Sequence, residues 1–409
     1  MVIPLSRNRN YNILWSSQLF SELATEITQI AFPLLILSLS GSPLQIGLVS
    51  SLLMAAHMAS IVPAGVIADR WNRKKVMLVC QGVRATVMTG LAVAVVLDAY
   101  SFQLVLVVAV IEGFFGSVFD PAEHAALPQV VPAAQLEQAV ARNTARPFIA
   151  TLVGPAAAGA LFTVHQVTPF AADAIMLSGS FIALIFLRLP HRRPLPDPSE
   201  ERTVRGDVAA GFRWVLGHRL IRITLIWMVF CNLILTALVV IVLAVSGEEE
   251  VGAGEIGLTM ACLGAGGLLG GICASRLNSA LSPRVILIGF SWTAPVLVAA
   301  MALVPTGIML GVLLGAAMFL VPVANTTVMT YQLVTTPDEL RGRLSSIAGF
   351  CSGGAGALGP LIGGLLASGN GATGILVCAG GLAVVAVVMT LSPSIRNFPR
   401  SKELAEVPS

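Results

Sequence analysis

Two glutamates four residues apart, Glu22 and Glu26, stand inside the first long apolar run of this 409-residue chain. Residues four apart share one face of a helix. Counted from Leu14, the two lie about 12 and 18 Å along that helix, near the middle of a bilayer. Charges at this depth are costly and are mostly functional. The pair suits a group that binds and releases a proton, and it equally suits a site for a cation. The alternative is a pair of acids satisfied by neighbouring helices or cavity water.

Further charged residues fall in or beside apolar runs: Arg84, Glu112, Asp120, Arg146 and Asp173. A buried arginine needs a partner, so we expect Arg84 to meet an acid on a neighbouring helix. Glu112 is a second candidate for proton binding. Asp173 is expected to cap the end of its helix, where an acid is favoured. His124 beside Glu123 predicts a pair at the surface.

Uncharged polar and aromatic side chains in or near the apolar runs are candidates for lining a substrate cavity. They are Gln18, Gln29, Asn143, Trp227, Asn232, Asn325 and Gln332. Each amide is equally suited to a hydrogen bond between helices.

The composition excludes a single water-soluble globule, because 56% of the residues are hydrophobic and only 11% are charged, against about 25% in soluble domains. The net charge of +3 is not gathered on a polar domain, which argues against nucleic-acid binding. What remains is a polytopic membrane protein, and its runs are too long and too continuous for barrel strands. We therefore predict an all-α membrane protein with twelve spans: 13–39, 44–68, 76–97, 103–122, 148–165, 169–189, 220–246, 256–275, 284–304, 307–331, 344–368 and 371–391.

The basic residues predict the orientation of these spans. All of the 24 lysines and arginines except Arg84 fall on one side of the predicted membrane. This side is the cytoplasmic one, so both termini are expected there. The excess of Arg over Lys, together with abundant Ala, Gly and Val, indicates a bacterial source. The acidic outer loops and basic inner loops fit the cytoplasmic (inner) membrane.

The chain is predicted to contain two similar halves. A polar linker at 191–217 separates a six-span bundle at 1–190 from another at 218–395, and a tail follows at 396–409. Landmarks recur at an offset of 205 to 206 residues, which argues for duplication. Parallel six-span repeats place a substrate site near their interface. One repeated landmark is a Gly-Pro segment with further small residues, which suits close helix packing and helix bending. It comprises Gly154, Pro155 and Gly159 in the first half, and Gly359, Pro360, Gly363 and Gly364 in the second.

The segment that follows the second span contains Gly65, Asp69, Arg70 and Arg73. It resembles the loop 2–3 motif of the major facilitator superfamily. The resemblance implies that this loop latches the two halves on the cytoplasmic side. Asp69 would then face a helix N-terminus of the second half, where the partial positive charge favours an acid.

The Gly-Pro segment of the fifth span resembles the antiporter motif of drug exporters in that superfamily. Phe119-Asp120-Pro121-Ala122 and Pro337-Asp-Glu-Leu-Arg341 resemble the branch that holds siderophore and macrolide exporters. The resemblance implies twelve helices in two pseudo-symmetric bundles, alternating access, and export of amphipathic small molecules by proton antiport. The alternatives are a dedicated exporter of one natural product or siderophore, and an importer.

This chain departs from that pattern in three places. The fourth span has Glu112 where many drug antiporters carry an arginine, Ala24-Thr25 replaces a Gly-Asp pair, and Ala158 replaces a glycine. No Gly-Lys of an ATP-binding loop and no hydrolase or metalloprotease motif occurs, and the six cysteines form no CxxC pair. We therefore expect no ATP, cofactor or metal and no enzymatic activity. The expected partners are a small-molecule substrate, protons and the lipid bilayer, and the expected state is a monomer.

Overall fold

Long helices make up most of the computed structural model, which describes residues 4–189, 213–249, 251–304 and 307–396. The chain divides into two compact units, one of residues 1–196 with 250–261 and the other of residues 197–249 with 262–409. The predicted linker at 191–217 lies mostly outside the described residues, and the predicted tail at 396–409 almost wholly does. The predicted domain boundaries therefore stay predictions.

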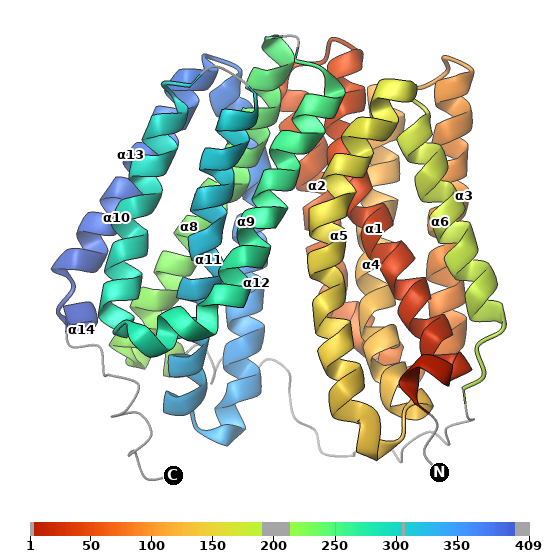
Figure 1. The fold of residues 1–409 in the computed structure, drawn as a ribbon, viewed down its shortest axis with the longest axis horizontal. Helices are drawn as coiled ribbons and strands as arrows, with labels where there is room; N and C mark the ends of the chain where they lie inside the picture. The colour runs from red at the N-terminus through yellow and green to blue at the C-terminus, as the bar shows by residue number, and fades with distance from the viewer. Residues whose placement is uncertain (1–3, 190–212, 250, 305–306, 397–409) are drawn as a thin grey trace. The chain divides into compact units, whose positions relative to one another are not determined.

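The long helices of the first unit follow one another through short connections (Figure 1). They are α1 (Arg9–Ser38), α2 (Pro43–Arg70), α3 (Arg73–Val96), α4 (Phe102–Val130), α5 (Leu136–Val164) and α6 (Thr168–Ile185), with short 3-10 turns at Leu5–Arg7 and Ala133–Gln135. Side-chain caps start several of them because the first backbone N–H groups of a helix lack partners. Ser42 forms a capping box with Gln45 at α2, and Asn72 caps α3.

The later helices begin after the linker. They are α8 (Arg219–Glu248), α9 (Ala253–Ala280), α10 (Pro283–Met301), α11 (Ile308–Thr335), α12 (Asp338–Ala367), α13 (Gly371–Leu391) and the short α14 (Pro393–Arg396). The first turns of α9 group with the first unit and the rest of α9 with the second.

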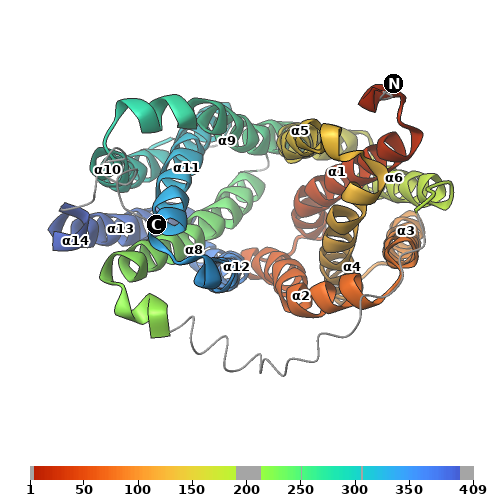
Figure 2. The same ribbon diagram turned by 90° about the horizontal axis from the view of Figure 1, so that it is seen from below.

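Helix pairing recurs between the units. In the first unit α1 packs on α5 and α6, and α3 on α4 and α6; in the second, α8 packs on α12 and α13, and α10 on α11 and α13. Figure 2 shows α1 beside α4, α5 and α6. Several polar side chains of α1 are buried among the helices of its own unit, among them Ser17, Gln18, Ser21 and Thr28.

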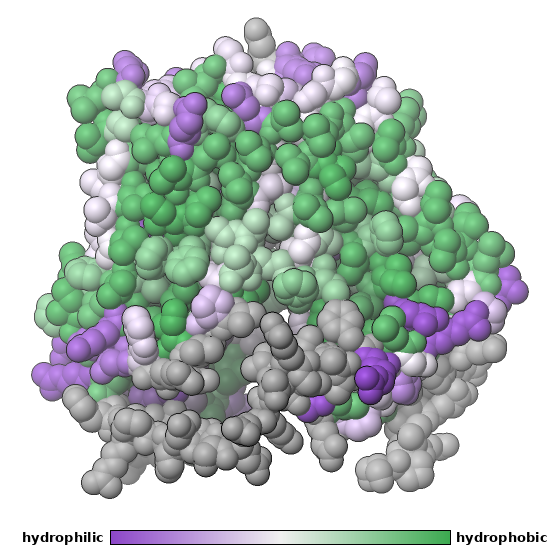
Figure 3. Space-filling view, turned by 180° about the vertical axis from the view of Figure 1, so that it is seen from behind, coloured by the Kyte–Doolittle hydropathy of each residue, from purple (hydrophilic) through white to green (hydrophobic). Residues whose placement is uncertain are grey.

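Twelve helices in the described part of the chain are long and apolar enough to span a membrane, which confirms the predicted number. Large apolar side chains such as Ile175, Leu303 and Val384 are more than half exposed, as lipid contact allows. Figure 3 shows apolar residues over the middle of one face and hydrophilic residues toward its two ends.

Two predicted boundaries depart furthest from the structure. The fifth span was expected at 148–165, but α5 begins at Leu136, and α4 continues to Val130 instead of ending at 122. The added segments carry charged and amide residues such as Glu123, Asn143 and Arg146, which lower the local hydropathy. Packing nevertheless buries all three side chains, because helix partners satisfy groups that an isolated span could not carry.

Candidate functional site

Polar side chains from four helices meet around α1. Arg84 of α3 is buried and donates from Nε to Oε1 of Glu112 on α4 at 2.6 Å, and its terminal nitrogen also contacts this oxygen. The same guanidinium donates to Ser21 Oγ at 2.6 Å and to Thr25 Oγ1 at 2.9 Å, both on α1. The predicted acid partner of Arg84 is therefore confirmed as Glu112. Through these hydrogen bonds Arg84 links α1 to α3 and α4. Removal of either Arg84 or Glu112 would leave the other as an unpaired buried charge.

The two glutamates on α1 face α5, but they have different partners. Glu22 accepts a hydrogen bond from Arg146 Nε at 3.0 Å and forms an ion pair with it. Glu26 accepts one from the hydroxyl of Thr151 at 3.0 Å. Within the described residues, Glu26 has no ion pair. One acid of the pair is thus held by a fixed cation, and the other is held by a neutral group.

Arg146 also reaches a third acid, Glu123 on α4, with 3.6 Å between NH1 and Oε1. Both side chains are buried, whereas His124 is exposed and lies 3.4 Å from Glu123. The expectation that His124 and Glu123 both lie at the surface is therefore wrong, because Glu123 is buried. The sequence does not predict Glu123 as a site residue, because the predicted fourth span ends at 122 and leaves Glu123 outside the membrane. The available signal was its position three residues after Asp120, on the same helix face.

Two further acids bond to α1. Asp120 accepts from Gln18 Nε2 at 2.9 Å, and Asp173 accepts from the hydroxyl of Thr28. Asp173 is fully buried and does not cap α6, whose N-cap residue is Val167. The capping interpretation is therefore wrong. The carboxylate lies inside the bundle, because α6 begins at Thr168, more than one turn before Asp173.

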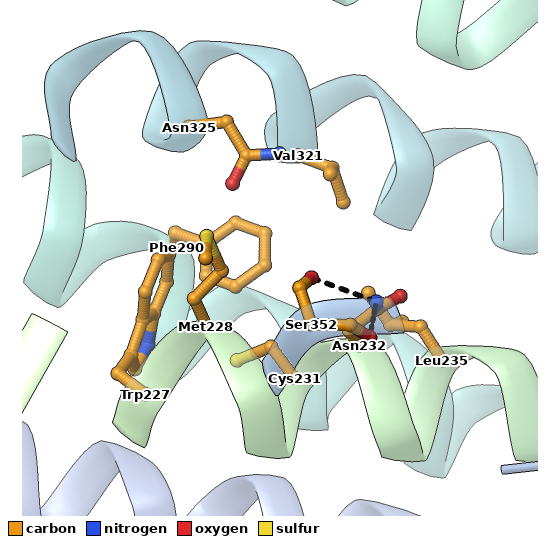
Figure 4. Close-up of a pocket in the computed structure, with 9 residues that line it drawn as sticks. All are labelled: Trp227, Met228, Cys231, Asn232, Leu235, Phe290, Val321, Asn325 and Ser352. Atoms are coloured by element: carbon orange, nitrogen blue, oxygen red, sulfur yellow. Dashed lines mark hydrogen bonds between the residues drawn. The ribbon is translucent and has the colours of Figure 1, made fainter. Parts of the chain in front are cut away.

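Three of the predicted cavity residues line one pocket in the second unit (Figure 4). The pocket has a volume of about 130 Å³ and carries no acidic or basic side chain among its nine lining residues, which are Trp227, Met228, Cys231, Asn232, Leu235, Phe290, Val321, Asn325 and Ser352. They come from α8, α10, α11 and α12. Trp227 and Asn232 are five residues apart on α8, a spacing that does not by itself place two side chains on one helix face. Their convergence with Asn325 therefore depends on the packing of α8 against α11.

The other predicted cavity residues do not join that pocket. Gln18 is bonded to Asp120, and Asn143 accepts from the Tyr11 hydroxyl at 3.4 Å, so both link helices in the first unit. Gln29 is exposed, and Gln332 is buried on α11.

The repeated small residues lie at close helix contacts. A Cβ atom on Gly154 would collide with Glu26, and one on Gly159 would collide with the backbone of α9 at Ala253, inside the same compact unit. In the second unit, Gly359 lies against Thr236, Gly363 lies against Ala237, and Gly364 is buried. Pro155 and Pro360 stand inside α5 and α12. These glycines therefore permit the α1–α5, α5–α9 and α8–α12 contacts.

The predicted latch falls largely outside the described side chains, which do not include those of Asp69 and Arg70 or the surroundings of Gly65. Arg73 donates to the backbone oxygen of Ala125 at 2.6 Å. In the part of the chain that the structure describes, no group of three or more His, Cys, Asp or Glu side chains could hold a metal ion.

Comparison with known proteins places this arrangement among membrane transporters. Residues 2–408 match a family model described as transmembrane secretion effector. The enterobactin exporter EntS of Escherichia coli O1:K1 / APEC is 26% identical over 341 residues, which cover 82% of this chain and 80% of the exporter. The nucleoside transporter NupG shares the fold with a TM-score of 0.71 at 16% identity, over 96% of this chain and all of that one. A bacterial homologue of the iron transporter ferroportin, in an inward-facing state, gives a TM-score of 0.70 at 16% identity, over 93% of this chain and 97% of that one.

Proposed function

Because the chain belongs to the transmembrane secretion effector family of major facilitator transporters, we propose that it exports amphipathic small molecules by proton antiport across the bacterial inner membrane. The predicted superfamily and its twelve-helix fold are confirmed, and the family and its homologues are transporters rather than enzymes. We expect the protein to work as a monomer with both termini in the cytoplasm.

The observation that carries the proposal is the unequal pairing of the two acids on α1. A proton arriving at Glu22 must compete with Arg146, whereas a proton arriving at Glu26 displaces no cation. Taking an unpaired carboxylate out of water costs far more free energy than taking out the neutral acid. Proton binding at Glu26 therefore stabilises conformations in which water is excluded from the α1–α5 contact, and proton release favours those in which water reaches it.

Glu112 becomes the weaker candidate for coupling. Its carboxylate is held by Arg84, so protonation would strand a buried guanidinium. We assign Arg84 and Glu112 to positioning, because their contacts fix the side of α1 that carries Ser21 and Thr25. Glu22 and Glu26 are then left facing α5.

Export is favoured over import by two features. The Gly-Pro segment of α5 resembles the antiporter motif, and the relative named above is an exporter of enterobactin. A dedicated exporter of one siderophore or natural product is the main alternative, and an importer has less support. We further propose that Gly65, Asp69, Arg70 and Arg73 form a latch that biases the balance between inward-open and outward-open states.

Proton flux in reconstituted vesicles tests the proposal. The vesicles would hold a pH-sensitive dye and receive a gradient of an ethidium-like cation, a macrolide or a catecholate siderophore. We expect substrate-dependent proton flux with at least one compound, and its loss in Glu26→Gln. The matched control is Glu137→Gln, an exposed acid in the first turn of α5, which should retain flux. Flux in Glu26→Gln equal to wild type would remove Glu26 as the coupling site. Wild-type protein that moves no protons with any of the compounds would contradict broad-specificity proton antiport.

A further inference from the structure

The pocket in the second unit combines two aromatic side chains, Trp227 and Phe290, with the polar side chains of Asn232, Asn325 and Ser352 (Figure 4). The rings of Trp227 and Phe290 lie edge to face with centroids 5.2 Å apart. Trp227 donates its Nε1–H to Ser291 at 3.0 Å. The indole therefore offers the pocket apolar ring surface, because its one donor is already used.

The amide groups in this pocket retain hydrogen-bonding capacity. Asn232 donates from Nδ2 to the backbone oxygen of Ser352 at 2.7 Å and to its hydroxyl at 3.0 Å, and no described residue donates to its Oδ1 atom. Asn325 is half-buried and makes no hydrogen bond within the described residues, and its side chain points from α11 toward the residues of α8 (Figure 4). A bound group thus meets one unpaired amide and one further acceptor.

The charge of the pocket selects against a cation. None of its lining residues is acidic, so an ammonium or amidinium group would lose its water without gaining a counter-ion. The attraction of a cation to the face of an aromatic ring is smaller than this desolvation cost. The first unit differs, because its buried acids include Glu112, Glu123 and Asp173.

The size of the pocket limits what enters it. Its volume of about 130 Å³ is close to that of the roughly 150 Å³ apolar cavity known to bind benzene in another protein. One six-membered ring fits, whereas a fused polycycle needs more space.

We propose that this pocket binds a single uncharged aromatic ring with a hydrogen-bonding substituent. The ring lies against Trp227 and Phe290, and the substituent bonds to Asn325 and to Oδ1 of Asn232. This assignment rests on the proposed function, since it names the class of chemical group that the transporter holds in its second unit. A substrate that carries both a cationic and an aromatic part would place only the aromatic part here.

Three small probes of matched shape test the inference on the full-length protein in nanodiscs. Benzamide is neutral and aromatic, benzamidine at neutral pH is its cationic analogue, and cyclohexanecarboxamide lacks the aromatic ring. Binding would be followed by saturation-transfer NMR, with empty nanodiscs to subtract partitioning into lipid. We expect benzamide to bind more tightly than either analogue. Asn325→Leu should weaken benzamide roughly fivefold, the effect of one lost hydrogen bond.

Asn325→Asp should reverse the preference toward benzamidine, because it supplies the missing counter-ion. Trp292→Phe is the matched control, since the indole of Trp292 is exposed on α10, donates to Thr390 and does not line the pocket. Equal binding of benzamide and benzamidine to wild type, or unchanged benzamide affinity in Asn325→Leu, would overturn the inference. The assay uses no ion gradient. Failed binding beside intact proton flux would reject only the pocket assignment, and intact binding without proton flux would reject only antiport.

Discussion

Gly154 of α5 lies so close to Glu26 of α1 that a Cβ atom at position 154 would collide with the Cβ atom of the glutamate. The second unit repeats this contact with Gly359 of α12 against Thr236 of α8. The two units thus share the helix contact, but only the first places an ionisable group in it. A glycine that only allows two helices to pack closely would have the same role in both units. If Glu26 is the proton-binding acid, as we propose, then the close packing of α5 on α1 directly affects the coupling site.

Gly154→Ala should impair transport because the added methyl group must displace the backbone of α1 at Glu26. Overpacking of this kind costs about 1–3 kcal/mol of stability, and we expect a lower thermal unfolding midpoint together with reduced substrate-dependent proton flux. Gly179→Ala in α6 is the control, since a Cβ atom there has no atom within 4 Å. A Gly154→Ala protein with wild-type flux would show that the close contact is not needed for coupling.

Thr151→Val tests the neutral partner of Glu26. The substitution keeps the shape of the side chain but removes the hydroxyl that donates to Oε1 of Glu26 at 3.0 Å. A lost hydrogen bond to a charged group is worth about 1.5–3 kcal/mol, so the coupled flux should fall by an order of magnitude or more. Thr144→Val is the control: Thr144 is exposed on the same helix, and among the described residues its hydroxyl bonds to the backbone oxygen of Val140 alone. Equal losses in both variants would indicate a general effect of threonine on α5.

Glu22→Gln should reduce coupled flux without abolishing it. Arg146 would still have Glu123 at 3.6 Å, and Glu26 would still be free to bind a proton. Side-by-side dye measurements of Glu22→Gln and Glu26→Gln check this ranking at one substrate concentration and one imposed gradient. The reverse pattern, with flux lost in Glu22→Gln and kept in Glu26→Gln, would transfer the coupling role to Glu22 and its arginine.

Local features of the fold could be predicted from the sequence, whereas the contacts between helices could not. Twelve spans follow from runs of apolar residues, and an acid partner for Arg84 follows from the cost of burying a charge. The identity of the partner, Glu112, depends on how α3 packs on α4. The beginning of α5 at Leu136 was missed because the burial of Arg146 is produced by Glu22 and Glu123. The spacing of Asp120 and Glu123 places both acids on one helix face, but it does not show that Arg146 of α5 packs against that face.

The candidate site was predicted in the same uneven way. The spacing of Glu22 and Glu26 predicts that they share a helix face, and both do face α5. Among the described residues, Glu22 has a cationic partner and Glu26 does not, and this difference depends on how α1 packs against α5. Likewise, Trp227, Asn232 and Asn325 were expected near a cavity from their types, yet their convergence needs α8 and α11 to come together.

The pair of Arg84 and Glu112 should behave as a structural lock in a double-mutant cycle. Each partner is almost fully buried, so Arg84→Met or Glu112→Leu alone leaves an unpaired charge and should cost about 3–5 kcal/mol of stability. The double variant Arg84→Met/Glu112→Leu removes both charges and should be clearly more stable than the sum of the single effects predicts. Unfolding midpoints in detergent measure the cycle, and proton flux of the double variant separates stability from coupling. If Glu112 only positions α1, a folded double variant should retain flux through Glu26. A well-folded double variant that carries no coupled flux would instead make Glu112 part of the proton pathway.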